Sequence, residues 1–241
     1  MKTAMTPMSR ESKVGSLAEL AGRVFLYQNN FLILICAFML GNSSISVGLP
    51  LGAVFYAACY GNTGFKLLTA LAVFIGAVVQ GSLETIFING ACMLLFSVLC
   101  APLRNKISIG VSFKAAVILF VCVLIPQLML SALRGYLLFD ILKAVFCAFI
   151  SLVLYFIFTF CIPMIAGTSK KTVPDSEEVI STAVTAALVL SGMGTVLLLG
   201  FSIRNIICVF VLLLFSYKCG AGIGAASGAV IGLIISISAE S

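Results

Sequence analysis

Histidine and tryptophan are absent from this chain of 241 residues, and charged side chains make up only 9% of it. Without histidine, the chain lacks the commonest catalytic base and the commonest metal ligand among side chains. Without tryptophan, only tyrosine and phenylalanine remain to form an aromatic belt at a membrane surface. Soluble domains carry about 25% charged residues. A composition that is 62% hydrophobic therefore indicates a polytopic membrane protein.

The sequence shows no catalytic or metal-binding motif. The nine cysteines form no CxxC pair and lie in or beside apolar runs, which favours a packing role over a disulfide framework or a metal site. The glycines of GAGIGAASG superficially resemble a dinucleotide fingerprint, but they lack the acidic residue about twenty positions on and the βαβ context. We therefore expect no catalysis, no cofactor and no nucleic-acid binding from this chain.

The apolar runs predict an all-α fold of about nine transmembrane helices packed as a bundle. Residues 1–30 read as an amphipathic segment on the cytoplasmic face and show no signal peptide. Residues 31–165 hold membrane helices 1 to 6, 166–176 a cytoplasmic loop, and 177–241 helices 7 to 9. The predicted spans are 31–47, 48–60, 65–80, 83–103, 112–130, 137–165, 179–199, 205–217 and 220–238. The first two are short and form a helical hairpin.

The distribution of basic residues predicts a cytoplasmic N-terminus in the plasma membrane, because inside segments are richer in Lys and Arg. With that orientation, most of the fourteen basic residues lie inside. The inside ones are Lys2, Arg10, Lys13, Arg23, Lys66, Arg104, Lys106, Lys114, Lys170, Lys171 and Lys218, against Arg134, Lys143 and Arg204 outside. An odd number of spans then leaves Ser241 outside, and merging the first two spans would change this parity.

The C-terminal stretch 216–238 carries Gly220, Gly224, Gly228 and Gly232 at intervals of four residues. In lipid, such a row favours close helix packing of the small-xxx-small kind. Two interpretations are open: tight packing within the bundle, or a specific face for dimerisation or docking. If the face serves assembly, replacing Gly224 and Gly228 by Ile should disrupt assembly or localisation without preventing membrane insertion.

Two further groups of charged residues have predicted roles. Asp175 followed by Glu178 resembles a capping box, and Glu177 and Glu178 lie in the first turn of the next helix, where the dipole stabilises negative charge. Asp140 and Lys143 are three apart at the start of span 137–165 and are predicted to form an intramembrane ion pair of structural rather than proton-relay character.

Three neutral polar residues, Gln80, Asn89 and Gln127, lie in predicted spans. Their side chains could form hydrogen bonds between helices, and packing is the default role for each. Lys114 lies one turn inside its span and is expected to reach the membrane surface with its long side chain.

The last part of the chain contains the stretches DSEEVISTAVTAALVLSGMG and FSIRNIICVFVLLLFSYKCGAGIGAASGAVIGLI. Together they resemble the membrane domain of stage II sporulation protein E. The matching residues are Glu177, Glu178, Gly192, Gly220, Gly222, Gly224, Gly228, Gly232 and Leu233. Upstream, the stretch 31–41 followed by Leu49-Pro50-Leu51-Gly52 resembles the first hairpin of that family.

The resemblance implies a ten-span domain with both termini in the cytoplasm, followed by a manganese-dependent serine/threonine phosphatase domain of the 2C type. That enzyme dephosphorylates an anti-anti-sigma factor and so activates the forespore sigma factor. The membrane domain anchors it at the polar septum and takes part in assembly with a tubulin-like division protein. The sequence stops at Ser241, before the final crossing and the phosphatase. It is therefore expected to be a fragment, or a split or degenerate relative.

Two functions follow as hypotheses. The first is a non-enzymatic membrane anchor and self-association module that sits in the lipid bilayer and concentrates a cytoplasmic partner. The second is a small-solute permease, for which the sequence offers Pro126-Gln127 and the polar stretch Asn42-Ser43-Ser44. Internal repeats would favour transport, and none aligns by eye.

Overall fold

The computed structural model describes residues 30–43, 48–62, 66–101, 113–133, 135, 138–166, 176–193, 197–198 and 201–239. Within those ranges the chain forms nine helices and one two-residue β-ladder, which confirms the all-α fold class. The helices are α2 (Asn30–Gly41), α3 (Leu51–Asn62), α4 (Lys66–Gln80), α5 (Leu83–Cys100), α6 (Phe113–Leu133), α7 (Leu138–Ile165), α8 (Ser176–Ser191), α9 (Ile203–Cys219) and α10 (Ala221–Ala239). The predicted amphipathic segment lies outside the described residues, apart from Asn30 at its end.

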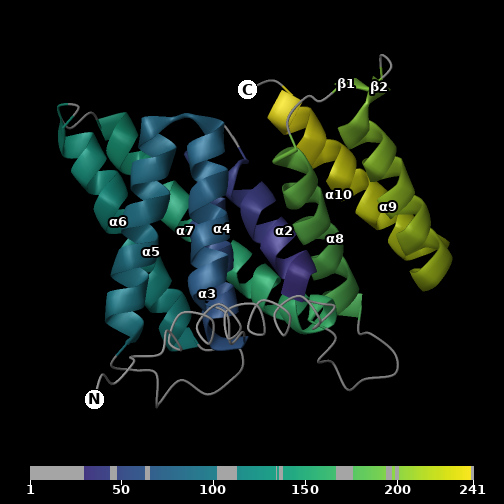
Figure 1. The fold of residues 1–241 in the computed structure, drawn as a ribbon, viewed down its shortest axis with the longest axis horizontal. Coiled ribbons are helices and arrows are strands. Elements are labelled where there is room, and N and C mark those ends of the chain that lie inside the picture. The colour runs from purple at the N-terminus through teal and green to yellow at the C-terminus, as the bar shows by residue number, and fades with distance from the viewer. Residues whose placement is uncertain are drawn as a thin grey trace, which may run out of the picture.

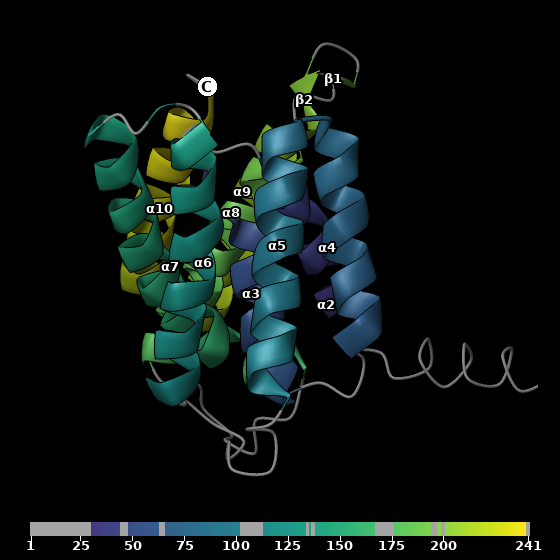
Figure 2. The same ribbon diagram turned by 90° about the vertical axis from the view of Figure 1, so that its left-hand side faces the viewer.

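The helices form two adjoining groups (Figure 1). Helices α2 to α7 make up the larger group, and α8, α9 and α10 make up the smaller one. Helix α8 joins the groups because it packs against α2 and α7 on one side and against α9 and α10 on the other. Figure 2 shows α4, α5, α6 and α7 lining one side of the molecule, with the smaller group behind them.

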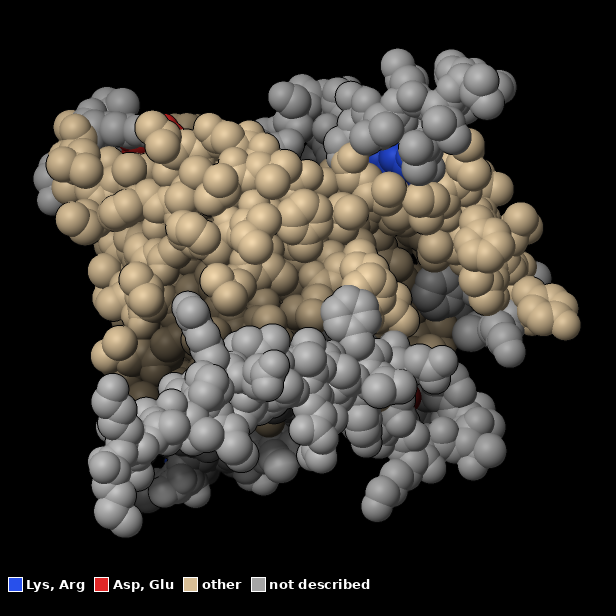
Figure 3. Space-filling view, in the orientation of Figure 1, with Lys and Arg blue, Asp and Glu red and all other residues tan. Residues whose placement is uncertain are grey.

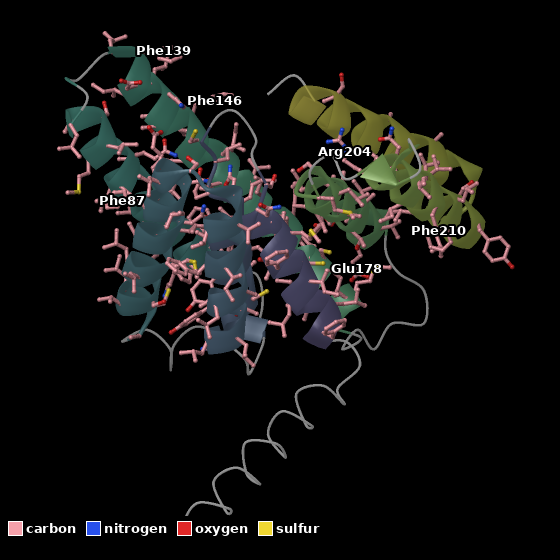
Figure 4. All side chains as sticks on the ribbon, turned by 45° about the horizontal axis from the view of Figure 1, so that its top comes forward. Phe87, Phe139, Phe146, Glu178, Arg204 and Phe210 are labelled. Atoms are coloured by element: carbon pink, nitrogen blue, oxygen red, sulfur yellow. The ribbon has the colours of Figure 1, made fainter. Side chains whose placement is uncertain are left out.

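The outer surface is that of a protein surrounded by lipid. Large apolar side chains are exposed around the described surface, and Phe87, Phe139, Phe146 and Phe210 lie on its outside (Figure 4). Figure 3 shows a described face almost free of charged atoms, which appear only near its edges. Helices α5, α6 and α7 are each long and apolar enough to cross a membrane. The predicted count of nine spans remains a prediction.

Helix α3 occupies the centre of the larger group. Every residue from Leu51 to Cys59 is buried, and the helix packs against α2, α4, α5, α6 and α7. Phe55 meets Phe158 of α7 edge to face, with ring centroids 5.4 Å apart. Helices α2 and α3 have 12 residues each. At 1.5 Å per residue each is about 18 Å long, and a hydrocarbon core is about 30 Å thick.

Two predicted spans differ from the helices that form. The span predicted for residues 31–47 ends as a helix at Gly41, and the span predicted for 179–199 ends at Ser191. Beyond α8, β1 (Leu197–Leu198) pairs antiparallel with β2 (Phe201–Ser202) and leads into α9. The two early helix ends lie side by side, and the polar contacts between them, described below, account for both differences.

Candidate functional site

The four glycines of the predicted row do not share one helix face, because Gly220 precedes α10 with φ +90° and only the other three lie within the helix. A Cβ on Gly224 would lie 2.6 Å from the Cβ of Ser216 in α9, and one on Gly228 would lie 2.9 Å from Leu212 Cδ1. A Cβ on Gly220 or Gly232 would have no heavy atom within 4 Å. Four residues turn an α-helix by about 400°, so a row at that interval rotates by about 40° per step. The two middle glycines therefore face α9 within the same chain, and the outer two do not.

The tightest helix crossings occur at isolated glycines outside that row. A Cβ on Gly76 of α4 would collide with the carbonyl oxygen of Phe38 in α2, and one on Gly41 would collide with the carbonyl oxygen of Val73. Both partners are backbone atoms, which cannot rotate away. Backbones this close require glycine, so α2 and α4 cross with their backbones in direct contact. No sequence motif marks it, because the two glycines lie on different helices.

Gly192, just beyond the end of α8, makes a third such approach. A Cβ there would collide with the carbonyl oxygen of Met39 in α2. Asn42 Nδ2 also donates a hydrogen bond to the Gly192 carbonyl at 2.8 Å. The hydroxyls of Ser43 and Ser191 lie 3.0 Å apart, and both residues are buried. These contacts join the ends of α2 and α8. The side chains that form them, Asn42, Ser43 and Ser191, are the polar residues at which the two apolar segments end.

Two amides hold the start of α3, as the sequence suggested they could. The backbone N–H of Ala53 donates to Asn89 Oδ1 of α5 at 3.1 Å, and Asn89 Nδ2 donates to the Thr85 carbonyl at 3.0 Å. Gln127 Nε2 of α6 donates to the Gly48 carbonyl at 3.2 Å. The first N–H groups of a helix lack partners within it, and lipid offers none. Hydrogen bonding between helices is thus confirmed for Asn89, whereas Gln127 bonds to the segment that precedes α3.

The predicted charged sites have the following positions. Asp140 and Lys143 lie in the first turns of α7 and line one small polar pocket, and their pairing with each other stays a prediction. Glu177 and Glu178 lie in the first turn of α8. Asp175, the proposed cap, lies outside the described residues.

The pocket has a volume of about 40 Å³ and includes residues that the sequence did not connect with Asp140. It brings together the start of α5, the last turns of α6, the start of α7 and the residue two positions before Pro50. The lining residues are Gly48, Glu84, Ile88, Gln127, Leu130, Ser131, Asp140 and Lys143. Among the described residues, no group of three or more His, Cys, Asp and Glu side chains gathers to hold a metal ion.

Comparison with known proteins connects the chain to a family. The model of the family described as "SpoIIE, N-terminal domain" matches residues 2–241, which is nearly the whole chain. No curated protein and no solved structure gave a significant match.

Proposed function

Because the chain belongs to the SpoIIE N-terminal domain family, we propose that it is a membrane anchor and self-association module. The family match is to the N-terminal domain and covers residues 2–241. The apolar outer surface supports the anchoring part of the proposal. The outward face of α10 supports the self-association part.

The observation that carries self-association is a stripe of small residues on α10 that faces away from the rest of the chain. Gly222, Ala225, Ala226, Ala229 and Gly232 are all exposed. Their spacing of three and four residues places them on one helix face. On the other face, Gly224 and Ser227 are buried. In lipid, small residues favour helix association because they let two backbones approach closely. We call the five exposed residues the α10 stripe, and its proposed occupant is the same stripe of a second copy.

The double substitution Ala225→Ile and Ala229→Ile is expected to weaken self-association by at least fivefold, because each added side chain separates the facing backbones. Co-purification of two differently tagged copies from one membrane measures this. The matched control is Val209→Ile with Leu213→Ile on α9, since both residues are exposed and large already. Equal recovery of the partner copy from the stripe variant and from the control contradicts the proposal.

The stripe variants test this idea more cleanly than Gly224→Ile and Gly228→Ile. Both of those glycines contact α9 of their own chain. A loss of assembly in the glycine variants would therefore also follow from a disturbed α9–α10 contact.

We place the N-terminus, and with it residues 102–112 and 167–175, in the cytoplasm. The excess of basic residues in those segments supports this orientation. A cysteine at Ala101, which is exposed after α5, should react with a membrane-impermeant maleimide only after permeabilisation. A cysteine at Leu138, which is 82% exposed at the start of α7, should react in intact cells. The reverse pattern of labelling contradicts the orientation. Labelling of the unmutated chain measures the background reaction of its own cysteines.

The enzyme that the anchor would hold at the membrane is inferred from the family resemblance. We propose a cytoplasmic phosphatase of the 2C type, manganese-dependent, acting on an anti-anti-sigma factor at the polar septum. The anchor raises the local concentration of this enzyme and of its partners, among them a tubulin-like division protein. Fluorescent tagging of the chain in sporulating cells tests the location, because an even distribution over the plasma membrane would contradict a septal role.

A small-solute permease is the second candidate, and one observation favours it. Helices α2 and α3 are each about 18 Å long, and the start of α3 is held by polar groups inside the bundle. Transporters place their sites at interrupted helices of this kind. Solute flux into proteoliposomes that contain only this chain would favour the permease over the anchor.

A further inference from the structure

An apolar groove lies between α4 and α5, which stand side by side on the outside of the larger group of helices (Figure 2). Its volume is about 320 Å³, which is within the range of pockets that hold small organic molecules. Its apolar walls include Leu67, Leu71 and Phe74 of α4 and Met93 and Leu94 of α5. Leu71 and Leu94 are exposed, so in a membrane the groove is open to lipid.

The groove extends from near one end of α5 toward the middle of the membrane. Residues 81 and 82 alone separate α4 from α5, so the two helices run in opposite directions. A Cβ on Gly90 would lie 3.9 Å from Phe74 Cε2, which places these residues at one end of the groove, and Leu67 and Ser97 mark the other. At 1.5 Å per residue, Ser97 lies about 5 Å and Gly90 about 15 Å from the end of α5. Since a hydrocarbon core is about 30 Å thick, this depth is that of an acyl chain in one leaflet.

The two polar side chains of the lining are Tyr56 and Ser97, and the hydrogens of their hydroxyls can be assigned. Ser97 Oγ lies 2.7 Å from the Met93 carbonyl oxygen and 3.0 Å from Tyr56 Oη. A serine hydroxyl has one hydrogen and a carbonyl only accepts, so Ser97 donates to Met93 and Tyr56 donates to Ser97. Within the described part of the chain, this is the one hydrogen bond of the Tyr56 hydroxyl. Tyr56 Oη therefore has lone pairs with which it can accept another.

These features select the kind of ligand. The apolar walls suit an acyl chain, and the Tyr56 hydroxyl suits a hydrogen-bond donor at the depth where the glycerol part of a lipid meets the hydrocarbon core. No charged side chain is part of the groove lining. The neighbouring Lys66 has its ammonium group over the Tyr60 ring, 3.8 Å from the ring centroid. An uncharged polar end therefore matches the lining better than a charged one, which would lose hydration without an opposite charge there.

We propose that the groove binds one acyl chain of an uncharged membrane lipid with a free hydroxyl on its glycerol, as in a diacylglycerol. The hydroxyl of the lipid donates a hydrogen bond to Tyr56 Oη, and the chain runs between Leu71 and Leu94 toward Gly90. Bound there, the lipid fills the space between α4 and α5. The site is separate from the α10 stripe, which belongs to the other group of helices.

Photo-crosslinking of the purified full chain in phosphatidylcholine nanodiscs tests this. The probe is a diacylglycerol with a diazirine in one acyl chain, and mass spectrometry locates the labelled peptides. Labelling around Leu71 and Leu94 is expected to exceed labelling of the exposed α9 residues Val209 and Leu213 by at least fivefold, and unlabelled dioleoylglycerol should remove the excess. Equal labelling of both faces overturns the proposal. Removal of the excess by phosphatidylglycerol as readily as by dioleoylglycerol also overturns it, because the site would then accept a charged headgroup.

The hydrogen bond is tested by removing its donor and its acceptor in turn. With the unmutated chain, dioleoylglycerol methylated on its hydroxyl should compete about fivefold more weakly than dioleoylglycerol, because it cannot donate. In Tyr56→Phe the two compounds should compete equally. Ser97 keeps its bond to the Met93 carbonyl in this variant, so no buried donor is left unpaired. The matched control is Tyr155→Phe, a buried tyrosine of α7 outside the groove lining, and it should keep the fivefold difference. A difference that persists in Tyr56→Phe overturns the assigned bond.

Filling the groove tests its position without involving the hydroxyls. A Cβ on Gly90 would make only an ordinary contact with Phe74, so a leucine side chain there can occupy the groove without a backbone collision. Gly90→Leu is expected to abolish the excess labelling. Gly61→Leu is the control, since Gly61 is exposed in α3 and a Cβ there would have no heavy atom within 4 Å. Labelling that is as strong in Gly90→Leu as in Gly61→Leu would place the lipid elsewhere and overturn the proposal.

Discussion

Replacing Gly76 by valine is expected to lower the unfolding midpoint by about 10 °C or to prevent folding. A Cβ at this position collides with the Phe38 carbonyl oxygen and lies 3.1 Å from the Cα of Gly41. Inserting atoms into a packed interior typically costs about 1–3 kcal/mol, and more where the surroundings cannot move. Both partners here are backbone atoms, so relief requires α2 and α4 to separate. About 3 kcal/mol corresponds to a midpoint shift of about 6–12 °C for a chain of this size.

Gly61→Val is the matched control for this prediction. Gly61 is exposed in the last turn of helix α3, and a Cβ there would have no heavy atom within 4 Å. The same change of residue in a helix should therefore leave the midpoint within about 2 °C, because the intrinsic helix propensities of glycine and valine are similar. Thermal unfolding followed by circular dichroism in one detergent compares the two. Equal midpoints would show that the α2–α4 crossing is not the constraint that its geometry indicates.

Replacing Asn89 by leucine is expected to lower the free energy of unfolding by about 2–3 kcal/mol. Asn89 is only 2% exposed, and its Oδ1 accepts the Ala53 N–H in the first turn of α3. Leucine would leave that buried N–H without a partner, which costs about 1–3 kcal/mol, and its greater bulk would strain the packing. Because nearly all of α3 is buried, water has no easy route to the freed group.

Asn205→Leu serves as the control, since Asn205 is exposed in the first turn of α9. Chemical unfolding in mixed micelles, compared between the two variants, gives the difference. The proposed role of Asn89 fails if Asn89→Leu unfolds at the same denaturant concentration as the control. Hydrogen exchange at the Ala53 amide adds a local readout, because a weakened helix start should exchange faster in Asn89→Leu.

The sequence predicts the long helices well and the short ones less well. The starts of α5, α6 and α7 agree with the predicted spans to within one residue, because long uninterrupted apolar runs have few alternatives to a helix in lipid. The predicted span 31–47 runs six residues beyond the end of α2 at Gly41. The contacts that accompany it are the hydrogen bond from Asn42 to Gly192 and the approach of Gly192 to Met39, and both join residues about 150 positions apart.

In the candidate sites, too, the sequence predicts contacts between residues that are close in the chain but not contacts between separate segments. Asp140 and Lys143 were recognised as neighbours because three residues along a helix bring them to one face. Ser131, Glu84 and Gly48 join them only through the packing of four segments, which spacing does not reveal. Likewise, a repeat of four glycines is easy to see at residues 220–232, whereas the tighter contacts at Gly41 and Gly76 involve single glycines on separate helices.

The buried position of α3 bears on the order in which the protein is assembled during synthesis. Helix α3 is complete at Asn62, but α7, which supplies Phe158 against Phe55, begins only at Leu138. At about 5–20 residues per second, roughly 4–15 s of translation separate the two. During that interval each helix of the newly synthesised α2–α3 hairpin is shorter than the hydrocarbon core is thick. The hairpin also lacks its contact with α7. We expect it to stay beside the insertion machinery until α7 emerges, so that the core closes late and in one cooperative step.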